Sequence, residues 1–286
     1  MRRGAVIAGS LLVAGVCGCA VLQVHEDRPS PEELARRQQW SEAAQAAMDH
    51  GEWARAQGLL EQLLAEAPKS AEAYLRFGRV SEAQNAPDRA EAAYRKALKL
   101  EPEYPDALLA LGRLEARTNR LEDALGHIQK SIAFGPEKAQ AHEAEGQVLE
   151  ALGRADEALA AYFRALAADP GAATAQLRAA ILQIDRGQND QALARLTHVL
   201  ELTPGAPEVL YQRGRAYLAL GHLPEALADL RAAASAWPDH AEVFCLLAQA
   251  LEQDQQPAAA REAAHRALLL APTSVEIRNL SERLRR

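Results

Sequence analysis

Small and aliphatic residues recur along the chain in the same order every 34 residues. Proline marks this interval most regularly, at Pro68, Pro102, Pro136, Pro170, Pro204, Pro238 and Pro272. When each proline is taken as position 32, seven units follow: 37–70, 71–104, 105–138, 139–172, 173–206, 207–240 and 241–274. Elsewhere the chain is poor in glycine and proline and rich in alanine and leucine. This composition predicts that each unit is helical.

Two positions of the unit hold only alanine or glycine. Position 20 is Ala56, Ala90, Ala124, Ala158, Ala192, Ala226 and Ala260, and position 8 is Ala44, Gly78, Gly112, Gly146, Ala180, Gly214 and Ala248. Helices approach closely only where the side chains between them are small. We therefore expect two antiparallel helices in each unit, crossing at positions 8 and 20.

Position 15 marks the turn between the two expected helices. It is occupied by Gly51, Asn85, Asn119, Gly153, Gly187, Gly221 and Gln255. The residue that ends a helix often has left-handed backbone angles, which glycine and asparagine adopt with least strain. Gln255 departs from this pattern, so the prediction is weakest at the turn of the last unit.

The period and these positions together resemble the tetratricopeptide repeat, over residues 37–274. The resemblance implies an all-α, right-handed solenoid of seven helix–turn–helix repeats that bury their apolar stripes by stacking. Ser30-Pro31-Glu32-Glu33 predicts an N-capped helix that leads into the first repeat, so the folded region is expected to span 30–274. Apolar Ile277, Leu280 and Leu284 predict a capping helix over 275–286.

The N-terminus has the pattern of an export signal, since Arg2 and Arg3 precede an uncharged stretch from Gly4 to Leu22. Within it, the segment Val16-Cys17-Gly18-Cys19 resembles a bacterial lipobox. The resemblance implies that a signal peptide of residues 1–18 is removed and that Cys19 is lipidated. Residues 19–29 would then tether the repeats to a membrane.

Two alternatives to lipidation remain open. Residues 4–24 are about long enough to span a bilayer uncleaved, since roughly 20 residues are needed. Cleavage without lipid attachment would instead release an exported protein. All three outcomes place the repeats outside the cytoplasm, in the cell envelope.

Charge and residue types exclude several functions. The formal net charge is −7 and becomes −9 without residues 1–18, so nucleic acid is not an expected partner. The chain has no phosphate-binding glycine loop, HExxH or GxSxG, and its cysteines lack zinc-site spacing. We therefore predict no catalytic residues, metal or cofactor, and the repeats leave no room for an enzyme domain.

His142 and Glu145 are the strongest candidates for chemistry, because they lie one turn apart at normally apolar positions. Two groups on one helix make no catalytic constellation, so we expect local hydrogen bonding on a half-buried face. Cys245 is expected to be a small packed residue rather than a disulfide partner.

Candidate binding residues follow from the resemblance. In tetratricopeptide proteins, positions 2, 5, 9 and 12 of the first helices line a concave groove that takes a partner's peptide or helix. These positions hold large apolar side chains in repeats 5 and 6 and arginines in repeats 2, 3 and 6: Leu177, Ile181, Ile184, Tyr211, Leu218, Arg79, Arg113 and Arg215. We expect an exposed apolar patch with charged flanks. Alternatively, Leu177 and Ile181 pack against the next repeat.

One subtype of the family is not matched. Chaperone-binding repeats hold a terminal carboxylate with Lys at position 5 and Asn at position 9, followed by Asn at position 6 of the next repeat. Repeat 1 has Ser41 and Gln45 followed by Arg76, and no other window fits.

The expected function is therefore a non-catalytic scaffold that binds other proteins in the bacterial cell envelope. A sharper version is a pilotin-like or outer-membrane assembly lipoprotein, since known proteins of both kinds combine a lipobox with such repeats. A glycan-binding accessory subunit of an envelope enzyme complex is a further alternative, for which the groove offers Tyr211 as its aromatic residue.

Overall fold

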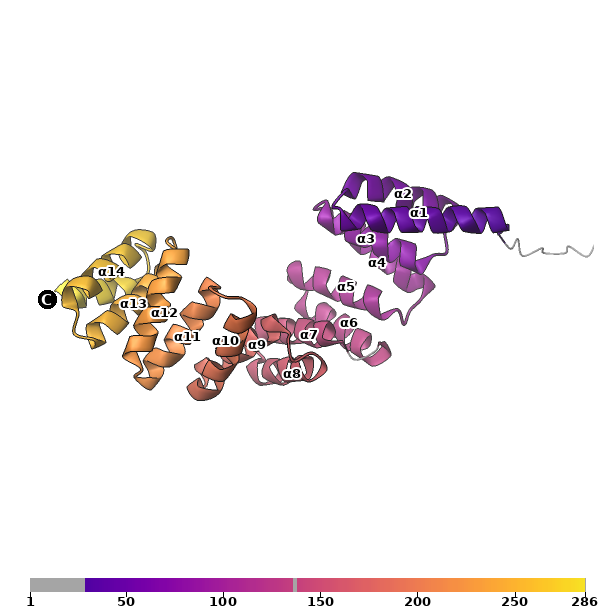
Figure 1. Ribbon diagram of the computed structural model, residues 1–286. Coiled ribbons are helices and arrows are strands. Elements are labelled where there is room, and N and C mark those ends of the chain that lie inside the picture. The colour runs from indigo at the N-terminus through magenta and orange to yellow at the C-terminus, as the bar shows by residue number, and fades with distance from the viewer. Residues whose placement is uncertain (1–28, 136–137, 286) are drawn as a thin grey trace, which may run out of the picture.

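A computed structural model describes residues 29–135 and 138–285, so the signal peptide, Cys19 and nearly all of the tether lie outside the described residues. The described residues form fifteen helices and no strand. These helices follow one another along a curved array, with α1 and the C-terminus at opposite ends (Figure 1). Their bounds are α1 Pro31–Asp49, α2 Trp53–Glu66, α3 Ala71–Ala83, α4 Pro87–Leu100, α5 Pro105–Arg117, α6 Leu121–Phe134, α7 Ala139–Ala151, α8 Ala155–Ala168, α9 Ala173–Asp185, α10 Asn189–Leu202, α11 Pro207–Leu220, α12 Leu223–Ala236, α13 Ala241–Gln253, α14 Pro257–Leu270 and α15 Val275–Arg285.

Each predicted repeat supplies one pair of these helices, from α1 and α2 to α13 and α14. Within a pair the two helices pack against each other, and the second helix then packs on the first helix of the next repeat. Several successive first helices also contact one another, such as α3 with α5 and α11 with α13. No comparable contact joins successive second helices among the described residues. The first helices therefore form the inner row of the curved array.

The predicted close approach at positions 8 and 20 is confirmed. All seven alanines at position 20 are fully buried. Opposite the glycines at position 8 lies the side chain at position 24, so that a Cβ on Gly146 would come within 2.6 Å of the Tyr162 ring. A Cβ on Gly214 would come within 2.7 Å of Leu230. Real Cβ contacts are longer than this, so the side chain at position 24 lies too close for an added Cβ at Gly146 and Gly214 unless it shifts.

The left-handed turn residue is confirmed in every repeat. Six of the seven are glycine or asparagine at φ between 57° and 79°, with Gly51 and Gly221 among them, and Gln255 adopts φ 57° as well. The last turn therefore has the same backbone conformation as the others, although glutamine is more strained than glycine at this positive φ.

Both ends of the array are closed by the predicted helices. The Ser30 hydroxyl accepts from the Glu33 N–H at 3.2 Å, and the Glu33 carboxylate accepts from the Ser30 N–H at 2.7 Å, which completes a capping box. At the other end, Ile277 and Leu280 of α15 are buried against α13 and α14, with Leu284 partly buried beside them. These contacts cover the apolar face that the last repeat would otherwise expose.

Candidate binding surface on the first helices

The expected apolar patch on repeats 5 and 6 does not form as an exposed surface. Ile184 is only 8% exposed and belongs to the core around α9 and α10, so its assignment to an exposed groove was wrong. Leu177 is half-buried against the same core, as the alternative interpretation held, and Ile181 is half-buried as well. Tyr211 and Leu218 are half-buried against the core of the last two repeats.

The physical reason is the contact between successive first helices. Because α9 touches α11 and α11 touches α13, large side chains at positions 5 and 12 are drawn into the seam between repeats. The burial removes apolar surface from water without a partner.

Two cavities along the first helices nevertheless each bring two of the predicted binding residues together. The first, of about 360 Å³, brings Arg79 of α3 and Arg113 of α5 together. The second, of about 350 Å³, lies near the C-terminal end and brings Tyr211 and Arg215 of α11 together. Leu177, Ile181 and Ile184 line neither of these cavities, and Leu218 does not either.

The first cavity carries more basic than acidic side chains. Arg117 pairs with Glu82 at 2.8 Å and Lys138 pairs with Asp106 at 2.7 Å, which neutralises both carboxylates of the cavity wall. Arg113 is exposed and donates to the backbone carbonyl of Gln140 at 3.0 Å. Arg79 is also exposed.

Neither Arg79 nor Arg113 has a carboxylate within ion-pair distance among residues 29–135 and 138–285. The cavity therefore holds an excess of two positive charges in a chain whose net charge is negative. This is the property that an anionic partner group would recognise.

Sequence reasoning missed Arg117, Lys138 and Gln140 as members of this cavity. Arg117 stands at position 13, four residues after Arg113, so helical spacing places it on the same face and could have found it. Gln140 stands at position 2 of its repeat, one of the groove positions, so the repeat register could have found it. Lys138 precedes α7 in the segment that joins repeats 3 and 4, whose path depends on tertiary structure.

The second cavity has no excess of positive charge, because its lining holds one arginine and the carboxylates of Glu242 and Glu276. Arg215 donates to Asp185 and to Gln212, both at 2.9 Å, so its charge is already paired. Cys245 also lines this cavity and is 6% exposed. Burial, with the nearby Glu276 and Glu242, raises the pKa of the Cys245 thiol to about 11. A neutral, buried thiol is a packing group and a poor nucleophile.

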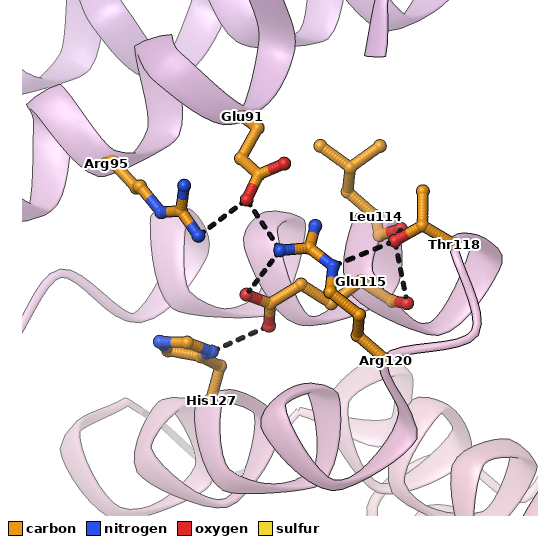
Figure 2. A network of polar contacts seen from close by, with 7 residues as sticks. All are labelled: Glu91, Arg95, Leu114, Glu115, Thr118, Arg120 and His127. Carbon is orange, nitrogen blue, oxygen red and sulfur yellow. Dashed lines mark hydrogen bonds and ion pairs between the residues drawn. The ribbon is translucent and has the colours of Figure 1, made fainter. Parts of the chain in front are cut away.

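Away from the cavities, a network of polar contacts joins repeats 2 and 3 (Figure 2). Arg120, at the turn after α5, lies between Glu91 of α4 and Glu115 of α5, with nitrogen–oxygen distances of 2.7 and 3.8 Å. Glu115 is 1% exposed, and its other oxygen lies 2.7 Å from Nδ1 of His127 on α6. Hydrogen bonding from Arg120 holds the pKa of the Glu91 carboxyl below its ordinary value.

This network contains a carboxylate–histidine pair but brings no serine, threonine or cysteine nucleophile to the imidazole among the residues drawn (Figure 2). The Thr118 hydroxyl donates hydrogen bonds to the backbone carbonyls of Leu114 and Glu115. The arrangement satisfies a buried carboxylate at the seam between two repeats, which is a structural role.

His142 and Glu145 have a similar surrounding. His142 Nδ1 lies 3.4 Å from Glu145 Oε2, and Arg164 of α8 pairs with the same oxygen at 3.4 Å. The predicted local hydrogen bonding is present, but the face is buried rather than half-buried, since His142 is 3% exposed and Glu145 4%. Burial is deeper than expected because α6 and α8 both cover this part of α7.

Among the described residues, no group of three or more His, Cys, Asp or Glu side chains is arranged to hold a metal ion. Within residues 29–135 and 138–285, no helix combines the length and the apolar character that crossing a bilayer requires.

Comparison with known families covers almost the whole array. Residues 40–153 match the middle TPR-like domain of cilia and flagella-associated protein 70. Residues 149–210 and 184–228 match one tetratricopeptide repeat model, and residues 211–275 match another. The chain is a tetratricopeptide-repeat protein. Among curated proteins, none matches the sequence.

Solved structures resemble this tetratricopeptide-repeat protein in fold. A chain of the APC/C hetero-tetramer Cut9–Hcn1 has a TM-score of 0.68 at 16% identity over 84% of this chain, which spans 48% of that chain. PilF of Pseudomonas aeruginosa has a TM-score of 0.66 at 18% identity, over 74% of this chain and 97% of its own. YrrB, described as a TPR protein with an unusual peptide-binding site, has a TM-score of 0.56 at 24% identity, over 68% and 97%.

Proposed function

We propose that this protein is a non-catalytic scaffold of the bacterial cell envelope, which holds segments of partner proteins along its first helices and is anchored through Cys19. The observation that carries the binding role is the open cavity between α3 and α5, where Arg79 and Arg113 face solvent without a carboxylate partner among the described residues. Isolated guanidinium groups in a cavity are free to bind carboxylates in pairs of charge-assisted hydrogen bonds.

The binding role is tested by photo-crosslinking in the native cells. A benzophenone side chain replaces Ala110, which lines the cavity, and in a second strain replaces Lys130, which is exposed on α6. We expect a discrete protein adduct from position 110 and none of that size from position 130. Equal labelling at both positions, or no adduct at either, would remove the case for a binding surface on the first helices.

The anchoring role is tested separately. Cys19→Ser should abolish labelling by radioactive palmitate and shift the protein from the membrane fraction to the soluble envelope fraction. If Cys19→Ser stays in the membrane, the uncleaved anchor replaces lipidation. A wild-type protein found in the cytoplasm would contradict the envelope location altogether.

A pilotin-like role is a second candidate. PilW, a type IV pilus biogenesis factor, shares the fold with a TM-score of 0.63 at 21% identity, and this chain covers 97% of it, as it does PilF. At this identity the likeness concerns the fold alone, so the candidate rests on the combination of the fold with the expected lipobox. Loss of surface pili on deletion of the gene would support it, and unchanged pili would exclude it.

Glycan binding has less support, because Tyr211, the aromatic residue on which it would depend, is half-buried against the core. Sugars stack on exposed rings.

A further inference from the structure

A repeated contact closes the inner surface between some repeats. In repeat 2, the hydroxyl of Tyr94 donates to Glu82 at 2.5 Å, and Arg117 of repeat 3 pairs with the same carboxylate. Repeat 4 has the same arrangement, in which Tyr162 donates to Glu150 and Arg178 of repeat 5 pairs with Glu150 at 3.1 Å. We call this arrangement the tyrosine clasp; it consists of Tyr at position 24, Glu at position 12 and Arg from the next repeat.

Repeat 3 lacks the tyrosine clasp. Its position 24 is Ile128 and its position 12 is Ala116, so neither the ring nor the carboxylate is present. A cavity of about 370 Å³ opens at this joint between α5, α6 and α7. Its lining is mostly apolar and includes Ala116, Leu121, Ile128, Ala144, Val148 and Ala151.

This apolar cavity and the basic cavity share two walls. Arg113 and Arg117 line both, with the basic cavity towards α3 and the apolar cavity towards α7. Arg117 is engaged by Glu82, whereas Arg113 contacts only a backbone carbonyl among the described residues. A group bound in one cavity is therefore next to a group bound in the other.

We infer that the adjacent cavities form one site for an extended protein segment in which an acidic side chain stands close to a large aliphatic or aromatic one. The inference rests on the proposed scaffold function. The carboxylate binds Arg79 and Arg113 in the basic cavity, and the apolar side chain fills the space that the tyrosine clasp occupies in repeats 2 and 4.

Charge and volume both favour such a segment. The excess of two positive charges favours an anionic group, and this chain itself is acidic, so a second copy of it is repelled overall. Each cavity is at the lower end of the range of about 300–1,000 Å³ that is usual for ligand sites, which suits one or two side chains. The site differs from the chaperone clamp, because Arg79 and Arg113 both stand at position 9 of successive repeats.

The site is tested by peptide selection. A random peptide library displayed on phage is selected on the wild-type protein and on Arg79→Glu/Arg113→Glu. The wild type should enrich peptides with Asp or Glu close to Leu, Ile, Phe or Met. The variant should bind these peptides at least about tenfold more weakly, because a charge-assisted hydrogen bond contributes free energy on that scale. No acidic enrichment on the wild type, or equal binding of the same peptides to the variant, would overturn the inference.

Two further variants separate the cavities and control for folding. Lys99→Glu/Lys130→Glu makes the same change in charge on exposed residues of α4 and α6 and should leave peptide binding unchanged. Ala116→Phe fills the apolar cavity and should remove the apolar preference while the acidic one remains; Ala151→Phe, at an exposed wall position, serves if the first variant melts differently by circular dichroism. Loss of peptide binding in Lys99→Glu/Lys130→Glu would mean that the peptides respond to the net charge of the protein rather than to this site.

The outcome is distinguishable from failure of the proposed function. If the adduct from position 110 survives Arg79→Glu/Arg113→Glu in cells, the scaffold stands and the assigned ligand chemistry falls. If the wild type gives no adduct at all, the proposed function falls first.

Discussion

The hydroxyl of Tyr94 and the carboxylate of Glu82 meet at 2.5 Å, and the same carboxylate binds Arg117 of the next repeat. The ring of Tyr94 is fully buried over Gly78, so one side chain both fills the repeat and reaches the joint to its neighbour. Burial and the hydrogen bond to Glu82 raise the pKa of Tyr94 far above its ordinary value, so the hydroxyl is protonated and can donate at neutral pH.

Tyr94→Phe should destabilise the protein by about 1–2 kcal/mol, because it removes one charge-assisted hydrogen bond and keeps the ring. Urea unfolding followed by circular dichroism measures the change. Tyr74→Phe is the matched control, since the described residues offer its hydroxyl no hydrogen bond. Equal losses in the two variants would show that the bond to Glu82 contributes nothing.

Gly146→Ala should lower the free energy of unfolding by about 1–3 kcal/mol, because its Cβ would overlap the Tyr162 ring, which is itself fully buried. Gly126→Ala, in the middle of α6, meets no atom within 4 Å and should instead stabilise by about 0.5–1 kcal/mol. Thermal and urea unfolding of the two variants should therefore shift in opposite directions. A shift in the same direction would mean that the close approach at position 8 is relieved elsewhere.

Gln255→Gly should stabilise the last repeat by about 0.5–1 kcal/mol, because a residue with a Cβ is strained at φ 57°. The reverse change, Gly153→Gln at φ 74°, should destabilise by a similar amount. Differential scanning calorimetry of both variants checks the signs. A loss of stability in Gln255→Gly would indicate that the glutamine side chain makes a contact that outweighs the strain.

The ion pair between Glu91 and Arg120 should make stability depend on pH. The pKa of Glu91 is lowered in the folded protein, so its contribution is present above the ordinary carboxyl pKa and is lost as pH falls through the folded value. The wild type should therefore unfold at higher urea concentration than Glu91→Gln near pH 7, and the difference should shrink as pH falls below the ordinary carboxyl pKa of 4.5. A difference that persists in acid would assign the effect to packing rather than to charge.

Cys245 should react slowly in the folded protein. With its pKa raised to about 11, its thiolate fraction near about pH 8 should be roughly a hundredfold below that of an unfolded cysteine. Alkylation by iodoacetamide is compared in buffer and in urea, with Cys17→Ser/Cys19→Ser as the background so that one thiol remains. The native rate should rise with pH up to about 11. Rapid native alkylation near neutral pH would contradict the buried, neutral thiol.

The repeat architecture was predictable because its signals are local. A left-handed turn at position 15, a small residue at position 20 and a capping box at Ser30 each act within one helix pair or one helix end. Even Gln255, the exception in its column, takes the common conformation because the neighbouring helices impose it.

Exposure on the first helices was predicted less well. Positions 5, 9 and 12 were assigned to one face from helical spacing, which holds, but the spacing says nothing of how closely the next repeat approaches. Arg79 and Arg113 remain exposed in a cavity, whereas Ile184 is covered at the seam. The difference depends on the packing of one repeat on another.

By itself, the sequence determined the period, the helix pairs, their turns and both closing helices, because these depend on residues close together in the chain. Tertiary structure decided which side chains of the inner face meet solvent. The cavity beside Ala116 lies where repeat 3 has Ile128 and Ala116 in place of the tyrosine and glutamate of the tyrosine clasp. The charge of the neighbouring basic cavity arises because Arg117 and Lys138 pair with acids while Arg79 has no such partner among the described residues. Such pairings join residues about one repeat apart, and only the stacking of repeats brings them together.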